Sequence, residues 1–426
     1  MNCSIKKINR VSGTLNLPGD KSISHRALII SSLARGKSEI INLGNGDDIK
    51  SSINCLQQLG IHIEQSGEKT TVIGNGFEGY QKSVGHLNAG NSGTTARLMS
   101  GILAAQKFDS VIIGDNSLSL RPMRRVAEPL FKMGAKINLS ERGTLPAYFF
   151  SVDRLEAIEY QLPVPSAQVK SSILLAGLHI NGETKVKESS STRNHTENLL
   201  GLIVNSANNK IVSYSSREYY PTAKEYFVPG DISTAVFFIV LTLLSKNSEL
   251  ILKNVSLNPT RTEIINILIA MGARIEIELI GTSNNEQFGN LIVKSSDLSN
   301  IKIDVVKIPL IIDEIPILTI AGIFAQGDFE IRGAKELREK ESDRISAICG
   351  NLKKMGLYVE EFDDGFGISG KRMNSKVAFE SFGDHRIAMS FAVLASLVDE
   401  GGEISNYECV NISNPEFLKQ LQSISN

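Results

Sequence analysis

The sequence predicts an α/β protein of two similar lobes, each built from about three copies of one small α/β unit. Two recurring patterns support this prediction: helix ends at which a glycine precedes a strand, and polar turns that lead into a short strand. The chain has 426 residues, of which 42% are hydrophobic and 21% charged. That is the composition of a globular protein with enough chain for more than one domain.

The first pattern places a glycine between an apolar helix end and alternating apolar residues. It occurs at residues 59–63 (LGIHI), 133–137 (MGAKI), 271–275 (MGARI) and 355–359 (MGLYV). Glycine is common just past a helix because it adopts the left-handed conformation there, and the alternation indicates a strand. Each occurrence therefore predicts a helix-to-strand transition.

The second pattern is a polar turn followed by a short strand. It occurs at residues 36–40 (GKSEI), 182–186 (GETKV), 247–251 (NSELI), 327–331 (GDFEI) and 401–404 (GGEI). The spacing of roughly 65 to 80 residues is longer than the period of solenoid repeats and fits a small α/β unit. We therefore expect about six such units.

Between these patterns lie apolar runs that begin with small or hydroxyl residues and predict helices, at residues 92–99, 171–177 and from 231 onward. The last is preceded by the breaker pair Pro229-Gly230, which we take as the domain boundary. With about three units on either side of this boundary, we expect two similar lobes of nearly equal size. A cleft between the lobes is the expected active site.

Charge and composition exclude several classes of protein. A net charge of −1 and the absence of Trp argue against nucleic-acid binding through bulk basic charge or aromatic stacking. Residues 1–10 lack the apolar core of a signal peptide, and the longest apolar run, near residues 235–244, is too short to span a bilayer. We expect a soluble cytoplasmic protein whose scattered cysteines are reduced and bind no zinc: Cys3, Cys55, Cys349 and Cys409.

Residues 19–26 (GDKSISHR) gather cationic and hydroxyl side chains at the start of a predicted helix. Ser22 or Ser24 is the expected N-cap, with Lys21 and Arg26 flanking the free amides. Such a terminus favours an anion, here a phosphorylated or carboxylated small molecule. The alternative is an ordinary capped helix with solvated basic side chains, but residues 383–390 (GDHRIAMS) repeat the design in the other half of the chain.

Other segments carry similar groups, each with a plainer explanation. Residues 91–97 (NSGTTAR) start a helix with a glycine that admits a ligand to the backbone, and residues 120–125 (LRPMRR) form a basic loop or a solvated face. Residues 165–172 (PSAQVKSS) offer hydroxyl, amide and ammonium groups, the last from Lys170, that suit phosphate or a polyol. Capping by Ser166 or Ser171 explains that segment nearly as well.

Two charged segments lie in the second half of the chain. Asp313 and Glu314 interrupt the apolar run of residues 308–323. A carboxylate among apolar residues is costly unless it is paired or exchanges a proton, so we interpret Asp313 as functional. Residues 335–344 (KELREKESDR) mix both signs of charge, which alone indicates only a solvated helix face.

Taken together, the motifs resemble the 5-enolpyruvylshikimate-3-phosphate (EPSP) synthase family, the 3-phosphoshikimate 1-carboxyvinyltransferases of the shikimate pathway. They follow the family's order over nearly the whole chain, as far as Pro415. The matching segments are residues 19–26, 90–97 (GNSGTTAR), 121–123 (RPM), 165–168 (PSAQ), 193–197 (RNHTE), 340–344 (KESDR) and 383–386 (GDHR).

The resemblance implies the two-lobed inside-out α/β barrel of the enolpyruvyl transferases, with three βαβαββ units in each lobe. It also implies that the chain starts in one lobe, builds the other and returns, so that the first lobe comprises residues 1–19 plus 231–426 and the second lobe residues 20–230. It implies transfer of the enolpyruvyl group of phosphoenolpyruvate to the 5-hydroxyl of shikimate 3-phosphate, through a tetrahedral ketal and with release of phosphate. Neither a metal nor an organic cofactor is expected, nor a nucleic-acid or membrane partner. A monomer is the simplest expectation.

The resemblance also assigns residues to roles. The catalytic set comprises Glu341 as proton donor, Asp313 as base, and Lys21 and His385 as assisting groups. The expected phosphoenolpyruvate contacts are Lys21, Asn91, Gly93, Arg121, Gln168, Arg344 and Arg386. The expected shikimate 3-phosphate contacts are Lys21, Ser22, Arg26, Ser166, Ala167, Gln168, Thr192, Asp313 and Lys340.

Three positions are informative when compared with the family's usual residues: two depart from them and one matches. Ile412 stands where many relatives carry a lysine, so one phosphoenolpyruvate contact is missing, and Ala167 stands where some carry a second serine. Gly93 is retained where an alanine would crowd the phosphoenolpyruvate pocket, which implies sensitivity to glyphosate.

Two alternative functions stay open. One is the sister enolpyruvyl transferase that acts on UDP-N-acetylglucosamine, although the reactive cysteine of its mobile loop is absent from residues 115–125. The other is a non-catalytic anion-binding protein of the same fold, which would not need Asp313 and Glu341 beside the arginines.

Overall fold

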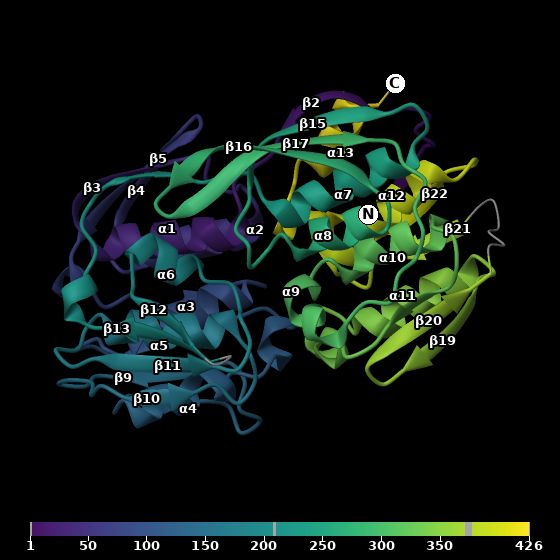
Figure 1. Cartoon of the computed structure of the whole chain (residues 1–426). Coiled ribbons are helices and arrows are strands. Elements are labelled where there is room, and N and C mark those ends of the chain that lie inside the picture. Colours follow the sequence, from purple (N-terminus) through teal and green to yellow (C-terminus); the bar gives the residue numbers. More distant parts are fainter. Residues whose placement is uncertain (1, 208–209, 371–376, 426) are drawn as a thin grey trace. The chain divides into compact units, whose positions relative to one another are not determined.

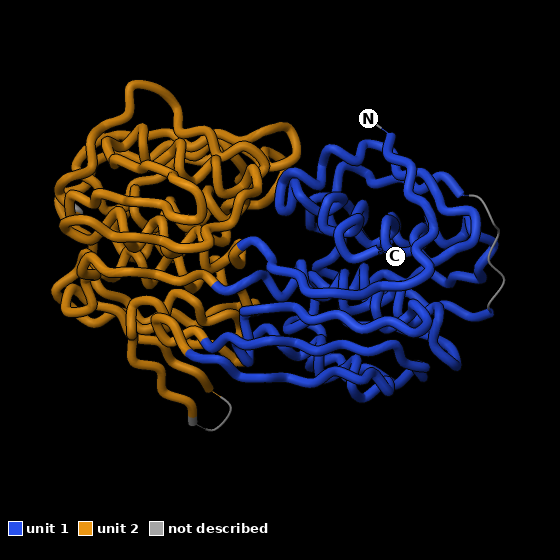
Figure 2. Tube along the Cα trace, turned by 90° about the horizontal axis from the view of Figure 1, so that it is seen from above, with its two compact units in different colours: residues 1–18, 229–281, 287–426 blue, residues 19–228, 282–286 orange. Residues whose placement is uncertain are grey.

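The computed structural model describes residues 2–207, 210–370 and 377–425. The chain divides into two compact units, shown in different colours in Figure 2. Unit 1 contains residues 1–18, 229–281 and 287–426, and unit 2 contains residues 19–228 and 282–286. The prediction differs from these bounds mainly at residues 282–286, which it assigned to the first lobe.

Unit 2 contains three four-stranded sheets, with strand orders β14-β3-β5-β4, β6-β7-β9-β8 and β10-β11-β13-β12 (Figure 1). Their strands are β3 (Arg35–Ile41), β4 (His62–Ser66), β5 (Lys69–Asn75), β6 (Leu87–Asn88), β7 (Ser110–Ile113), β8 (Lys136–Asn138), β9 (Ala147–Phe150), β10 (Glu159–Gln161), β11 (Thr184–Glu188), β12 (Val204–Ala207), β13 (Lys210–Ser215) and β14 (Glu225–Phe227).

The helices of unit 2 form an inner and an outer set. The inner helices are buried over nearly their whole length: α1 (Lys21–Leu33), α3 (Gly93–Leu103) and α5 (Ala167–Gly177). Two of the outer helices, α2 (Asp47–Gln58) and α4 (Arg124–Lys132), alternate buried and exposed residues, and the third, α6 (His195–Leu200), is a short helix of buried and half-buried residues. Helices that are buried on every side must lie inside the unit, so the sheets lie outside them.

Unit 1 also contains three sheets, with strand orders β1-β22-β21, β16-β17-β15-β2 and β18-β20-β19. Their strands are β1 (Cys3–Ile5), β2 (Ser12–Asn16), β15 (Glu249–Ser256), β16 (Arg274–Ser283), β17 (Glu286–Lys294), β18 (Phe329–Ile331), β19 (Tyr358–Phe362), β20 (Gly365–Ser369), β21 (Val377–Glu380) and β22 (Gly402–Ser405).

Unit 1 repeats the same division of helices. Its buried inner helices are α7 (Ile232–Leu244), α10 (Ile315–Phe324) and α12 (His385–Leu397). The others are α8 (Glu263–Ala270), α9 (Ile308–Ile311), α11 (Arg344–Lys354) and α13 (Phe417–Ser423). No helix in the described parts of the chain is both long and apolar enough to cross a membrane.

Three of the inner helices, α3, α5 and α12, each connect two parallel strands. Strands β6 and β7 are parallel and joined through α3, β10 and β11 through α5, and β21 and β22 through α12. An outer helix and an antiparallel hairpin, such as α4 with β8 and β9, complete a unit. The expected architecture of six α/β units, three per lobe, is thereby confirmed.

Two parallel pairs join segments that are far apart in the sequence. Strand β14 pairs with β3, and β2 pairs with β15. Strand β3 is the first strand of unit 2 and pairs with β14, which the chain reaches just before it leaves that unit. Strand β2 precedes unit 2 in the sequence and pairs with β15, which the chain reaches after its return to unit 1. This pairing explains why unit 1 contains both ends of the chain.

The predicted helix-to-strand glycines are confirmed by their backbone conformation. Gly60, Gly134, Gly272 and Gly356 have φ of +84°, +92°, +104° and +79°, the left-handed region that a side chain disfavours. Each follows an outer helix and precedes β4, β8, β16 or β19 respectively. The four cysteines are free, as expected.

Residues 282–286, at the turn of the β16–β17 hairpin, belong to unit 2 because their side chains bond there. Glu286 Oε1 lies 2.8 Å from His195 Nδ1 and accepts from Asn198 Nδ2 at 3.1 Å. The backbone N–H of Phe227 donates to Ser283 Oγ at 3.3 Å. Nothing in the local sequence of the hairpin signals these contacts.

The buried imidazole of His25 should make the protein sensitive to mild acid. Burial, with the nearby charges of Lys21 and Arg26, lowers the pKa of His25 well below its usual value. The unfolded chain then takes up a proton below about pH 6.5 while the folded chain does not, so stability is present above that pH and is lost as pH falls. We expect this histidine to remove about 2 kcal/mol of unfolding free energy between pH 7 and pH 5.

Urea unfolding of His25→Gln at pH 7 and at pH 5 measures this contribution. The fall in unfolding free energy between the two pH values should be smaller in the variant than in the wild type by about that amount. The exposed His62 offers the matched control, because His62→Gln should keep the wild-type pH dependence. An unchanged difference between pH 7 and pH 5 in His25→Gln would contradict the assignment.

Candidate active site

The residues predicted from the sequence fall into two groups, one in each unit. Those in unit 2 are Lys21, Ser22, Arg26, Asn91, Gly93, Arg121, Ser166, Ala167, Gln168 and Thr192. Those in unit 1 are Asp313, Lys340, Glu341, Arg344, His385 and Arg386. Most lie at or beside the N-terminus of a helix, where free N–H groups and the helix dipole favour an anion.

The three inner helices of unit 2 start with side-chain caps. Asp20 accepts from the N–H of Ile23 at 2.9 Å, Ser92 from Thr95 at 3.2 Å, and Ser166 from Val169 at 3.4 Å. The expectation that Ser22 or Ser24 caps α1 is wrong. The helix already begins at Lys21, so both serines lie inside it.

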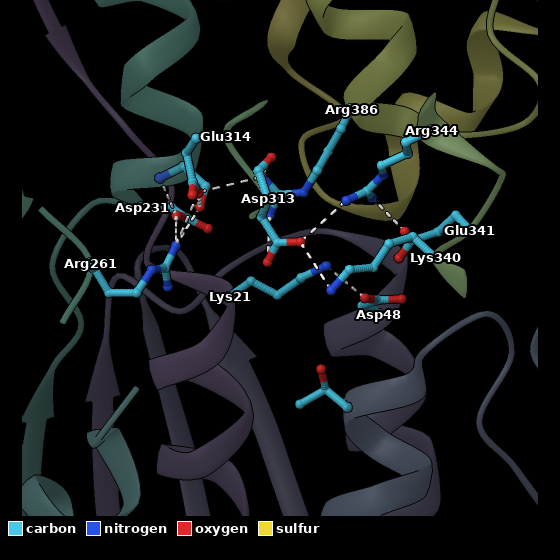
Figure 3. Close-up of polar contacts among 12 residues, drawn as sticks. Lys21, Asp48, Asp231, Arg261, Asp313, Glu314, Lys340, Glu341, Arg344 and Arg386 are labelled. Atoms are coloured by element: carbon cyan, nitrogen blue, oxygen red, sulfur yellow. Dashed lines mark hydrogen bonds and ion pairs between the residues drawn. The ribbon is translucent and has the colours of Figure 1, made fainter. Parts of the chain in front are cut away.

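Lys21, the first residue of α1, forms an ion pair with Asp48 on α2, with 3.0 Å between Nζ and Oδ2 (Figure 3). The side chain of Lys21 is 19% exposed and that of Asp48 7%. The pair fixes the direction of the ammonium and leaves it partly accessible. Sequence reasoning missed Asp48, although two consecutive aspartates at a helix start were a usable signal.

Gly93 lies beside two guanidinium groups. A Cβ added at Gly93 would be 3.1 Å from Arg97 Nη1 and 3.5 Å from Arg121 Nη1. Arg121 Nη2 donates to Asn91 Oδ1 at 2.8 Å, and Asn91 Nδ2 donates to Asp115 Oδ2 at 2.7 Å. The start of α3 therefore carries two cations around a residue without a side chain, an arrangement suited to an anionic ligand.

Gln168 extends this cluster to the start of α5. Its Oε1 accepts from Arg97 Nη1, and its Nε2 donates to Thr94 Oγ1 at 3.0 Å. Arg97 itself is only 5% exposed. The prediction did not assign a role to Arg97 or Asp115, because their contacts join segments that are distant in sequence.

Arg26 is buried and hydrogen-bonded within unit 2. Its guanidinium donates to Thr196 Oγ1 at 2.7 Å, Ser171 Oγ at 2.8 Å and the carbonyl of Ser22 at 2.9 Å. Burial lowers the pKa of Arg26 to about 10, which still leaves it charged at neutral pH. Arg26 thus joins α1 to α5 and α6 through buried hydrogen bonds, close in the chain to Ser22, one of the predicted shikimate 3-phosphate contacts.

The expectation that Lys170 offers a free ammonium ahead of the helix is wrong. Lys170 lies inside α5, its side chain is 1% exposed, and its Nζ pairs with Glu188 and Glu197. A helix that starts at Ala167 turns this side chain into the unit. Thr192, in contrast, lies in the connection between β11 and α6, and its hydroxyl donates to Glu188.

Arg344 is the centre of the group in unit 1 (Figure 3). It is 1% exposed, and its guanidinium donates to Asp384 Oδ2 at 2.7 Å, to Asp313 Oδ1 at 3.2 Å and to Glu341. Burial alone would lower the pKa of Arg344, but these three carboxylates raise it above the ordinary value. The arginine is therefore permanently charged and fixed in direction.

Asp313 lies in the turn between α9 and α10 among three cations. Besides Arg344, Lys340 Nζ lies 3.7 Å from Oδ1 and Arg386 Nη2 lies 3.9 Å from Oδ2, while Arg386 Nη1 donates to the carbonyl of Asp313 at 2.9 Å. The side chains of Asp313 and Glu341 are 14% and 17% exposed. Both carboxylates are thus accessible and held by one guanidinium, as proton-transfer groups need to be.

Asp384 caps α12 by accepting from the N–H of Arg386 at 2.8 Å, and it also binds Arg344. His385, the first residue of α12, is 1% exposed. Ile412 ends a 3₁₀ helix, Tyr407–Ile412, and is half-buried. Among the residues that the structure describes, no group of His, Cys, Asp and Glu side chains is arranged to hold a metal ion.

Sequence reasoning also missed a second buried cation in unit 1. Arg261, 2% exposed, has Nη2 at 3.6 Å from Glu314 Oε1 and 3.9 Å from Asp231 Oδ1. Glu314 Oε1 also lies 3.6 Å from Arg386 Nη1. Glu314 therefore shares one cation, Arg386, with its neighbour Asp313. The two adjacent acids in an apolar run were the available signal.

A family model described as EPSP synthase (3-phosphoshikimate 1-carboxyvinyltransferase) matches residues 5–421 of this chain. The 3-phosphoshikimate 1-carboxyvinyltransferase of Petrotoga mobilis is 46% identical, covering 100% of this chain and 99% of the relative. That of Thermoanaerobacter pseudethanolicus is 44% identical, covering 100% of both.

Solved structures give the same result. The EPSP synthase from Acinetobacter baumannii superposes with a TM-score of 0.87 at 38% identity, covering 100% of this chain and 98% of that one. The enolpyruvyl transferase NikO from Streptomyces tendae gives a TM-score of 0.78 at 15% identity, covering 99% and 96%, and that likeness supports the fold alone.

Removal of the Arg344 guanidinium should destabilise the protein strongly. Arg344→Gln leaves Asp384, Asp313 and Glu341 without their shared cation, and breaking a buried ion pair costs about 3–5 kcal/mol. Lys354→Gln is the control on the same helix, since its pair with Glu380 is half-exposed and should contribute less than about 1 kcal/mol. Urea unfolding at neutral pH measures both, and equal losses would contradict the central position of Arg344.

Proposed function

The chain belongs to the EPSP synthases, the 3-phosphoshikimate 1-carboxyvinyltransferases, and we propose that the residues gathered in its two units perform that family's reaction. The reaction transfers the enolpyruvyl group of phosphoenolpyruvate to the 5-hydroxyl of shikimate 3-phosphate and releases phosphate. It is a step of the shikimate pathway, which supplies aromatic amino acids. The observation that carries the assignment is the family match over residues 5–421.

We propose that three arginines grip phosphoenolpyruvate: Arg121, Arg344 and Arg386. Its phosphate is tetrahedral and its carboxylate planar, and guanidinium groups bind the oxygens of both with paired hydrogen bonds. Support comes from the fixed directions of Arg121, through Asn91, and of Arg344, through Asp384. Lys21, Gln168 and the backbone at Gly93 complete the proposed contacts.

Shikimate 3-phosphate is the proposed ligand of the helix starts in unit 2 that carry Ser22, Ser166, Ala167 and Gln168, with Thr192 nearby. Free N–H groups and hydroxyls at a helix start suit its phosphate. Lys340 and Asp313 are the proposed contacts of its ring hydroxyls. Arg26 is a further proposed contact of shikimate 3-phosphate, held in place by its hydrogen bonds to Ser22, Ser171 and Thr196.

The chemistry needs one proton donor and one base. We propose that Glu341 protonates the methylene carbon of phosphoenolpyruvate while Asp313 takes the proton of the 5-hydroxyl, whose oxygen bonds to C2. The resulting tetrahedral ketal then loses phosphate, whose departing oxygen takes up the proton that Asp313 had accepted, and a proton of the new methyl group returns to Glu341. Lys21 and His385 assist by stabilising charge or relaying protons.

Two substrates that form a bond must meet, and their proposed contacts come from both units. We therefore propose that Lys21 and Arg121 of unit 2 act on the same substrate pair as Arg344 and Arg386 of unit 1. We further propose that the protein works as a cytoplasmic monomer.

Exchange of either catalytic carboxylate should stop turnover without stopping binding. Glu341→Gln and Asp313→Asn keep the shape of the side chain but cannot transfer the proton, so kcat should fall by at least about 100-fold. Phosphate release with phosphoenolpyruvate and shikimate 3-phosphate measures kcat. Calorimetric titration of Glu341→Gln with shikimate 3-phosphate should give a near-unchanged Kd, because Glu341 is not among the proposed contacts of that ligand. Glu339→Gln, at an exposed neighbouring position, is the control that should retain activity.

The same assay separates the alternatives. Phosphate release with UDP-N-acetylglucosamine in place of shikimate 3-phosphate would identify the sister transferase. Binding of both shikimate-pathway substrates with no turnover by the wild-type chain would identify a non-catalytic anion-binding protein.

A methyl group at Gly93 should weaken the use of phosphoenolpyruvate, because the guanidinium of Arg97 would have to shift and the methyl group would lie against the guanidinium of Arg121. We expect Gly93→Ala to raise the KM for phosphoenolpyruvate by about tenfold, equivalent to about 1.4 kcal/mol. The wild-type enzyme should be inhibited by glyphosate and the variant less so. Gly350→Ala, where the added Cβ meets no atom within 4 Å, is the control. Turnover by the wild type that glyphosate leaves undiminished would refute the expected sensitivity.

A further inference from the structure

Lys170 is a buried lysine that no step of the proposed reaction uses. Its side chain is 1% exposed, and Nζ lies 2.6 Å from Glu188 Oε2 and 2.8 Å from Glu197 Oε1. Burial acts to lower the pKa of Lys170, but the attraction of the two carboxylates outweighs it and leaves the pKa raised. A buried charge persists only when it is paired in this way, so the ammonium is held at one place.

The two carboxylates flank one short connection. Glu188 is the last residue of β11, and Glu197 lies in the first turn of α6, so residues 189–194 run between them. Each carboxylate also has a second partner: Glu188 Oε1 accepts from Thr192 Oγ1, and Glu197 Oε1 accepts from Ser213 Oγ at 3.1 Å. One ammonium therefore fixes both ends of the connection that carries Thr192.

Lys170 is also tied to the start of α5. Its backbone N–H donates to the carbonyl of Ser166, the N-cap, at 3.0 Å. The first turn of α5, with Ser166 and Gln168, and the connection that carries Thr192 are thus fixed to each other through a single side chain.

Arg26 balances the charge of this group from α1. It binds Thr196 Oγ1 and Ser171 Oγ, and Thr196 Oγ1 donates to Ser171 Oγ at 2.7 Å. Two buried cations, Lys170 and Arg26, thus accompany two buried carboxylates, Glu188 and Glu197. Loss of the Lys170 charge would leave two adjacent carboxylates with one cation, and their repulsion would act on residues 189–194.

We propose that Lys170 is a positioning residue for the acceptor site: through Glu188 it sets the place of the Thr192 hydroxyl relative to Ser166 and Gln168. The inference rests on the proposed function, in which these three residues contact shikimate 3-phosphate. A purely structural ion pair would lower stability and affect the use of both substrates alike. A positioning role affects the acceptor and leaves phosphoenolpyruvate binding nearly untouched.

The first test compares Lys170→Met with Lys185→Met, whose lysine lies on the neighbouring β11, is 36% exposed and pairs only at the surface with Glu183. We expect Lys170→Met to raise the KM for shikimate 3-phosphate at least tenfold with the KM for phosphoenolpyruvate within about twofold. Lys185→Met should leave both constants unchanged. Equal changes of the two KM values in Lys170→Met, or a lower melting temperature with no change in KM, would overturn the proposal.

The second test needs no change at Lys170 and decides the matter if Lys170→Met does not fold. Glu188→Gln, Thr192→Val and the double variant form a cycle measured by the KM for shikimate 3-phosphate. If Glu188 acts through Thr192, the double variant should be no worse than Thr192→Val alone. If the KM of the double variant instead rises by the product of the increases in the two single variants, the two residues act independently and the proposal is overturned.

The wild-type protein in the same assay separates this inference from the proposed function. Absence of phosphate release by the wild type would mean that the proposed function has failed. Release by the wild type, with the acceptor KM unchanged in Glu188→Gln and Lys170→Met, would mean that only the positioning role has failed.

Discussion

Pairing of buried cations with carboxylates is the interaction on which the arrangement of both units depends. In unit 1, Arg344 is bound by Asp384, Asp313 and Glu341; in unit 2, Lys170 is bound by Glu188 and Glu197. Each group joins a helix to segments far along the chain. A mispaired charge inside a unit would cost several kcal/mol, so these contacts permit few alternative arrangements.

The scaffold brings such groups together by burying helices inside sheets. Because α1, α3 and α5 are covered along their length, their ends are the places where they can present polar groups to a ligand, and their N-termini hold Lys21, Gly93 and Ser166. The same holds for α12 in unit 1, which begins beside Asp384. A helix start supplies free N–H groups at no further structural cost, which suits a protein whose proposed substrates are anions.

Local sequence was sufficient wherever a feature depends on a few neighbouring residues. The glycines that end the outer helices are readable because a positive φ excludes most other residues, as at Gly60 and Gly272. The cap at Ser92 follows from its own hydroxyl. The choice of Asp20 over Ser22 as the cap of α1 shows the limit, since both side chains are suitable and only the observed start of the helix decides between them.

The sequence by itself determined the repeated α/β unit, the family, and the list of residues that carry charge or hydroxyls at helix starts. Only the tertiary structure decided which of those groups are bound to one another: that Lys170 is enclosed, that Arg26 lies beneath its neighbours, and that Arg344 holds both Asp313 and Glu341. The reason is physical. Periodicity and turn chemistry act over a few residues, whereas a buried ion pair joins positions that come together only when strands such as β2 and β15 have paired.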